Sequence, residues 1–154
     1  SGQQHHEAED GGARHAPGVG GIAGLIGLQK VATFDEVNAY ERANYQNLNP
    51  RPTLGIVSGL HELFPDNDLI LQSLYGFGDA IEPGGYLIYT GQPWHPQLEM
   101  IARCLSSHRE GQDWVMRRRS QQEMDQLVEK AGFEKVHQWI DDDGIFTVSL
   151  AVKK

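Results

Sequence analysis

Cysteine is almost absent from this sequence, and so are long apolar runs and an excess of basic side chains. Cys104 is the only cysteine among 154 residues, which excludes an intrachain disulfide framework and a cysteine-based zinc site. No run approaches the roughly 18 apolar residues of a membrane-spanning helix. Lys and Arg number 13 against 21 Asp and Glu, so the chain lacks the charge balance of a general nucleic-acid-binding protein. These absences predict a cytoplasmic protein with no membrane span and no nucleic-acid partner.

The first 21 residues are rich in Gly, His, Gln and acidic side chains and show neither helical nor strand periodicity. This composition predicts a flexible glycine-rich leader at 1–21, followed by a domain at 22–154. Gly18 to Ala23 does match the nucleotide-binding pattern G-x-G-x-x-A. That pattern works only when a strand leads into the glycines, and 11–17 is not strand-like. The sequence therefore favours a linker there over a cofactor-binding loop.

From about residue 30 onward, short apolar runs alternate with amphipathic stretches. Helix starts are marked by Asp66 with Asp68 and by a capping box of Ser120 with Glu123, and an Asp-Gly pair at 143–144 predicts a hairpin. This alternation predicts an α/β fold with a mostly parallel sheet and a C-terminal antiparallel hairpin. The expected strands lie at 31–37, 53–59, 85–90, 135–140 and 145–152.

Several local strings, in this order, resemble the second half of a class I S-adenosylmethionine-dependent methyltransferase domain. Residues 81–88 (IEPGGYLI) resemble the turn before the family's fifth strand, 131–133 (AGF) the start of its sixth, and 55–64 (GIVSGLHELF) its fourth strand and following loop. A narrower likeness is to a bacterial family of methyltransferases, often fused after an α/β-hydrolase domain; its residues are 49–53, 55–64, 89–97 and 114–119. The expected fold is thus a partial Rossmann-like sheet.

The resemblance begins at about Gly27, which leaves too few residues upstream for the family's first two strands and its glycine-rich loop. The resemblance implies S-adenosylmethionine as cofactor and a small-molecule or lipid-like methyl acceptor, with cofactor binding weakened by the missing half. The alternative is a non-catalytic remnant that folds as a homo-oligomer, because cutting the sheet exposes an edge and a face.

In open α/β sheets, ligands bind beyond the carboxyl ends of the strands, which directs attention to the loops after each one. His61 and Glu62 are the candidate catalytic residues, with a capped loop as the equally weighted structural alternative. Cys104 is expected in the core. The candidate cofactor-binding residues are Asn38, Ala39, Ser58, Gly59 and Leu60. The candidate substrate-binding residues are Thr90, Trp94, His95 and Arg118.

Two of these candidates have structural alternatives that the sequence favours. Trp94 and His95, between two prolines, suit a structural plug better than a substrate wall. The adjacent arginines at 117–119 suit a solvated edge better than an anion-binding cluster, and in a strand they would alternate faces. Methyl transfer needs no metal, so no metal site is predicted.

Overall fold

The computed structural model describes residues 37–106 and 116–154, which belong to a unit spanning Val37–Lys154. The predicted leader at 1–21 lies outside the described residues. So does the strand predicted at 31–37, apart from Val37, which is not in a strand.

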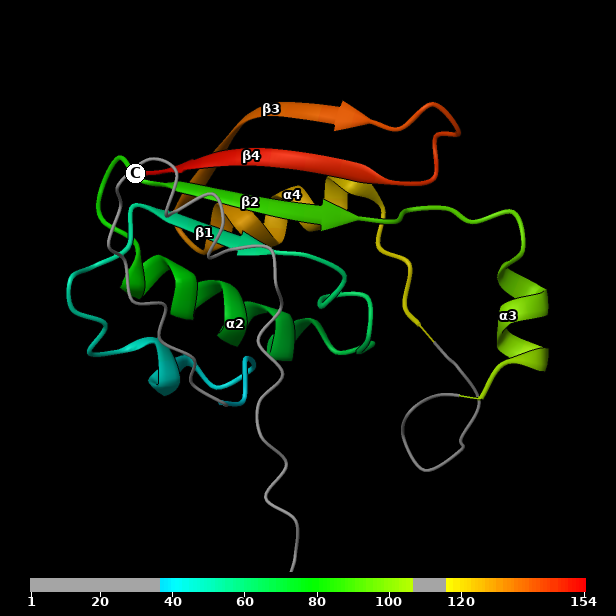
Figure 1. Ribbon diagram of the computed structural model, residues 1–154, viewed down its shortest axis with the longest axis horizontal. Coiled ribbons are helices and arrows are strands. Elements are labelled where there is room, and N and C mark those ends of the chain that lie inside the picture. The colour runs from blue at the N-terminus through cyan, green and yellow to red at the C-terminus, as the bar shows by residue number, and fades with distance from the viewer. Residues whose placement is uncertain (1–36, 107–115) are drawn as a thin grey trace, which may run out of the picture. The chain divides into compact units, whose positions relative to one another are not determined.

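Four strands form one sheet in the described part of the chain: β1 (Leu54–Val57), β2 (Tyr86–Gly91), β3 (Phe133–Ile140) and β4 (Thr147–Lys153). Their order across the sheet is β1-β2-β4-β3, as Figure 1 shows. β1 and β2 are parallel, whereas β4 runs antiparallel to both of its neighbours. The predicted α/β fold with a single reversed strand is therefore confirmed.

The turn between β3 and β4 confirms the predicted hairpin. Gly144 has a φ of 68°, a left-handed conformation that favours glycine, and its N–H donates to the carbonyl oxygen of Asp141 over 3.0 Å. The Asp141 side chain accepts a further bond from the N–H of Phe146 at 2.7 Å. The turn thus fixes the register in which Ile140 faces Thr147.

Helices α2 (Asn67–Ala80) and α4 (Gln121–Lys130) both begin at the predicted caps. Ser120 Oγ accepts a hydrogen bond from the N–H of Glu123 at 3.2 Å, which is half of the predicted capping box. The Glu123 carboxylate does not close the box; it accepts bonds from Asn67 and Arg117 instead. The cap therefore also ties the start of α4 to the start of α2.

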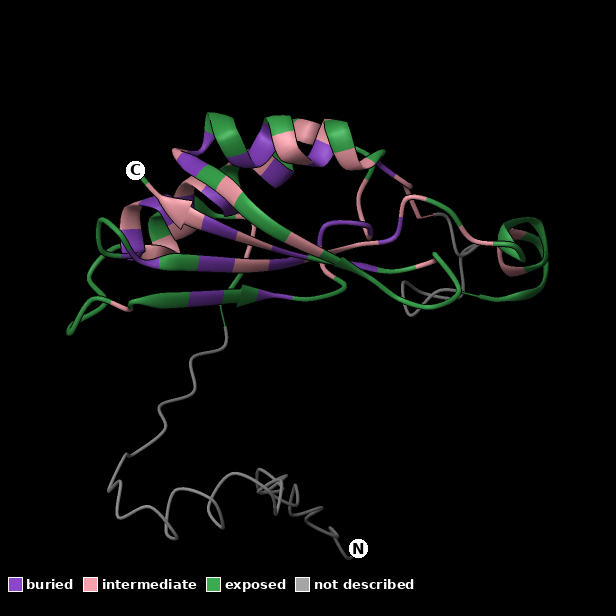
Figure 2. Ribbon diagram, turned by 90° about the horizontal axis from the view of Figure 1, so that it is seen from above, coloured by how far each residue is buried: buried purple, intermediate pink, exposed green. Residues whose placement is uncertain are grey.

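Both helices cover the same face of the sheet (Figure 2). Along β1, Gly55 and Val57 are buried toward this face, whereas Leu54 and Ile56 point away. The core consists of buried apolar side chains from β1, β2, β4, β3 and the two helices. The largest of these are Tyr89, Phe133, Ile70, Leu74, Ile81, Leu87 and Val128.

Two glycines in α2 permit close packing, as the sequence predicted. The short helix η1 (Arg42–Tyr45) packs on α2. As a result, a Cβ at Gly76 would lie 2.2 Å from the ring of Tyr45. A Cβ at Gly78 would lie 2.7 Å from the carbonyl oxygen of Ala131. The helix accepts two weak helix formers because neighbouring segments approach its backbone at these positions.

Helix α3 (Leu98–Cys104) corrects one expectation. None of its residues is buried, and Cys104 is exposed, so the prediction of Cys104 as a core residue was wrong. The apolar spacing of this segment indicated a helix correctly. It did not indicate burial, because a helix of 7 residues presents an apolar stripe that no described element covers.

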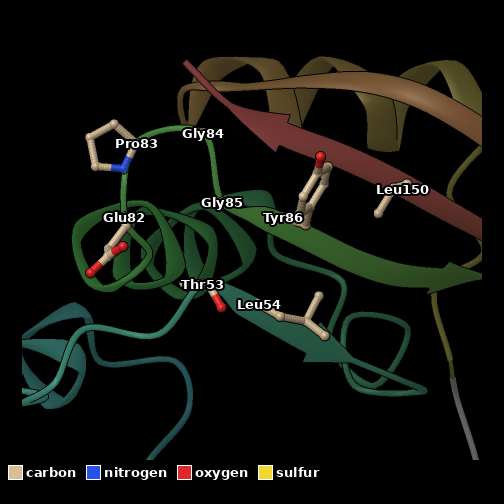
Figure 3. Close-up of a pocket in the computed structure, with 8 residues that line it drawn as sticks. All are labelled: Thr53, Leu54, Glu82, Pro83, Gly84, Gly85, Tyr86 and Leu150. Atoms are coloured by element: carbon tan, nitrogen blue, oxygen red, sulfur yellow. The ribbon is translucent and has the colours of Figure 1, made fainter.

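The sheet face opposite α2 and α4 is left open within the described residues. Ile56 is 62% exposed, and Leu54 and Tyr86 are each 46% exposed on it. A hollow of about 540 Å³ lies at the amino ends of β1 and β2, between the 82–85 turn and Leu150 (Figure 3). None of the helices in the described residues is long and apolar enough to cross a membrane.

Candidate functional site at the carboxyl ends of β1 and β2

A cavity of about 210 Å³ lies where β1 and β2 end. The chain leaves β1 through Ser58 and Gly59, and the N–H of Gly59 donates to Thr90 Oγ1 on β2 at 2.9 Å. That bond holds the two strand ends together beside the cavity. The residues that line it are Ser58, Gly59, Glu62, Thr90, Gln92, Met116 and Phe146.

Glu62 is the ionisable group of this cavity wall. Its side chain is 8% exposed, and Oε2 is buried without a hydrogen bond. Burial raises the pKa of the Glu62 carboxyl, while a bond from its own backbone and the charges of Arg118 and Arg119 act in the opposite direction. A carboxyl held in this way suits proton exchange with a bound molecule.

His61 lies next to Glu62 in the chain and is 3% exposed, but unlike Glu62 it does not line the cavity of about 210 Å³. Its Nε2 lies 3.2 Å from Ser73 Oγ on α2, and Nδ1 is buried without a hydrogen bond. Burial, and secondarily the charge of Arg119, lowers the pKa of His61 to about 4. The imidazole is therefore neutral near pH 7 and packs between the loop and α2.

The three arginines do not form a strand. Arg119 is 6% exposed and donates to the carbonyl oxygens of His61 at 2.6 Å and Phe64 at 3.0 Å. It also bonds the side chain of Asn67 at 2.8 Å. The interpretation as a solvated edge is therefore wrong for Arg119, because its guanidinium satisfies loop carbonyls that would otherwise be buried without donors.

Arg117 and Arg118 differ in their hydrogen bonds. Arg117 donates to Glu123 at 2.5 Å, and its backbone N–H donates to the carbonyl oxygen of Glu62 at 3.0 Å. Arg118 keeps Nε and Nη1 buried without a hydrogen bond, and burial lowers the pKa of its guanidinium. Arg117 and Arg119 thus support the loop, whereas Arg118 retains unused donors.

The segments predicted to contact the cofactor lie side by side. The hydroxyl of Tyr40 donates to the carbonyl oxygen of Leu60 at 2.6 Å, which joins the turn at Asn38 and Ala39 to the loop after β1. The Asn38 side chain is used within its own turn. Its Oδ1 accepts from the N–H of Tyr40 at 3.0 Å, and its Nδ2 donates to Glu41 at 3.0 Å.

Thr90 lines the cavity, but the other three predicted substrate residues, Trp94, His95 and Arg118, do not. Trp94 is 56% exposed, and His95 Nδ1 accepts a bond from the N–H of Gln97 at 3.1 Å. Gln92 also lines the cavity and was not predicted as a site residue, although it lies two residues beyond Thr90. In an extended chain residues i and i+2 share a side, so strand alternation could have found Gln92.

A sheet in which β1 and β2 are parallel and β4 is antiparallel to both of its neighbours is the class of fold that this chain shares with S-adenosylmethionine-dependent methyltransferases. The structure of such a methyltransferase from Methanosarcina mazei aligns with a TM-score of 0.60 at 18% identity, over 81% of this chain and 70% of that one. Magnesium protoporphyrin IX methyltransferase from Synechocystis PCC 6803, solved with bound SAH, aligns with a TM-score of 0.58 at 10% identity, over 88% and 57%.

A family model described as "Putative methyltransferase" matches residues 20–153, and the chain belongs to that family. It is 59% identical over 128 residues to the uncharacterized protein YnbC of Escherichia coli (strain K12). That match covers 83% of this chain and 22% of YnbC, so the chain spans less than a quarter of that relative's length.

Proposed function

We propose that this domain catalyses S-adenosylmethionine-dependent methylation of an oxygen or nitrogen atom of a small molecule. The observation that carries the proposal is the Glu62 carboxyl, buried in a cavity wall at the carboxyl ends of two parallel strands. The family membership and the shared fold support the reaction class.

The described residues fit the cofactor only in part. Ser58 and Gly59 leave the end of β1 accessible, and a Cβ at Gly59 would meet nothing within 4 Å. The Asn38 amide is uncharged, and both of its polar atoms are committed to its turn. One wall of a cofactor site is thus available, which supports weak binding by this chain.

When bound, S-adenosylmethionine supplies an electrophilic methyl group. The chain's own residues would hold the acceptor and move its proton. The Glu62 carboxylate accepts the proton of the attacking O–H or N–H, because its raised pKa makes it a stronger base than an exposed carboxylate. Thr90 and Gln92 orient the acceptor, while Met116 and Phe146 supply its apolar contacts. His61 then positions the loop that carries Glu62, by its contact with Ser73.

Titration of the 154-residue chain with S-adenosylhomocysteine, followed by calorimetry, tests cofactor binding. We expect saturable binding with a Kd near the millimolar range, equivalent to about −4 kcal/mol. Absence of saturable binding would count against methyl transfer by this chain. Micromolar affinity would overturn the proposed weakness, because it would require a complete cofactor site.

A non-catalytic, self-associating domain is the second candidate function, and the open sheet face supports it. Exposed apolar side chains of β1, β2 and β4 lie on that face, and within the described residues β1 has a strand partner on one side only. We expect wild-type protein to sediment as a dimer or larger species and Ile56→Lys to sediment as a monomer, since Ile56 is 62% exposed on this face. Met100→Lys on α3, which is 49% exposed in wild type, is the matched control. A monomeric wild type would remove this candidate.

A further inference from the structure

Gln92 is placed to orient the acceptor in the proposed chemistry, but the group of the acceptor that its amide contacts is not yet specified. It is 9% exposed, yet its amide makes no hydrogen bond to any described residue. It lines the cavity of about 210 Å³ and also the small space of about 10 Å³ next to it, and Glu62 lines both. The polar atoms of this amide are not fully buried, so the amide remains accessible to water or to a ligand in the cavity.

The remainder of the wall restricts what such a ligand can be. Pockets for drug-sized ligands are roughly 300–1,000 Å³, so this cavity suits a smaller molecule of about one ring. Its apolar contacts are the Phe146 ring and the Met116 thioether, and both side chains interact favourably with an aromatic ring. Its polar contacts are the Glu62 carboxyl, the Gln92 amide and two hydroxyl groups, of which Thr90 Oγ1 already accepts a bond from Gly59.

We propose that this cavity binds a single-ring phenol that carries a second oxygen substituent beside its hydroxyl group, and that Gln92 determines this specificity. The Glu62 carboxylate accepts the hydroxyl hydrogen. The Gln92 amide pairs with the adjacent oxygen, which it can serve as donor or acceptor. The aromatic ring packs on Phe146 and Met116. The proposal rests on the proposed function only in treating this phenol as the methyl acceptor.

Binding is measured by amide NMR on the full chain without S-adenosylmethionine, so its outcome is separate from that of the cofactor titration. The probes are 1,2-dihydroxybenzene, phenol and trans-1,2-cyclohexanediol. We expect 1,2-dihydroxybenzene to shift the signals of Thr90 and the Gln92 side chain. It should bind about tenfold more tightly than phenol, the value of one buried hydrogen bond. The saturated diol should bind more weakly than 1,2-dihydroxybenzene, because it cannot stack on Phe146.

Gln92→Met keeps the length of the side chain and removes its amide. We expect this variant to bind 1,2-dihydroxybenzene about tenfold more weakly while phenol binding is unchanged, which also shows that the cavity is intact. Gln126→Met, on the exposed surface of α4, is the matched control and should bind all probes as wild type does.

Three results would overturn the proposal. These are equal affinity for 1,2-dihydroxybenzene and phenol in wild type, an unchanged preference in Gln92→Met, and no shift at Gln92 with any probe at millimolar concentration. A site occupied only by water would give the last of these.

Discussion

Acidification from pH 6.5 to pH 4 is expected to lower the folding stability of this protein by about 3 kcal/mol through the single side chain of His61. Its folded-state pKa is lowered from 6.5 to about 4, mainly by burial. Between these values the unfolded chain binds a proton at this position and the folded chain does not, so stability rises with pH. The contribution is fully present above pH 6.5 and is lost as pH falls toward 4.

Urea unfolding at a series of pH values between about 4 and 7 measures this effect. The glutamine of His61→Gln cannot titrate, so the unfolding free energy of this variant should change less with pH than that of wild type. This holds whatever the stability of the variant at pH 7. Glu62 acts with the opposite sign, because its folded-state pKa is raised and acid therefore favours the folded form. The comparison is cleanest in a Glu62→Gln background. An equal pH slope with and without His61 would show that His61 is not the source.

Replacement of Glu62 by Gln is expected to reduce kcat for methyl transfer by about 10²–10⁴-fold, the usual contribution of a general base. Glutamine keeps the size and a hydrogen-bonding oxygen but cannot take a proton. In wild type the rate should rise with pH through the raised pKa of Glu62, because the carboxylate is the active form. This rise should be absent from the variant.

The matched control is Glu129→Gln, at an exposed position of α4, and we expect it to retain the wild-type rate and pH profile. The assay uses S-adenosylmethionine well above its Kd, so that weak cofactor binding does not mask the chemical step. A Glu62→Gln variant with the wild-type kcat would remove Glu62 from the mechanism and leave positioning alone to account for catalysis.

The sequence predicted the fold because its signals are local. The cap at Ser120 and the Asp-Gly pair each act through neighbouring residues, and each was found in place. The exposure of α3 could not be predicted in this way. An apolar stripe shows that a helix could pack against another element. Whether Cys104 is buried depends on whether such an element packs against α3, and this is not a local property of the sequence.

The candidate site was predicted in part for the same reason. The loop after β1 could be placed at the carboxyl end of the sheet from topology alone, which brought Glu62 into consideration. The support of this loop by Arg119, however, could not be predicted, because Arg119 lies more than 50 residues further along the chain and donates to the carbonyl oxygens of His61 and Phe64. Met116 and Phe146 reach the cavity from two other distant segments of the chain, and no spacing rule links them to Glu62.

The central position of β4 in the sheet also sets an order for folding. Its pairing with β3 joins residues that are close in the chain, as in Ile140 with Thr147, whereas its pairing with β2 joins Tyr86 to Val152. Closing the longer loop costs more chain entropy, and contacts of this range form more slowly. The hairpin of β3 and β4 should therefore form first and dock onto β2 as a unit, so that the cavity beside Glu62 is completed only in the last step.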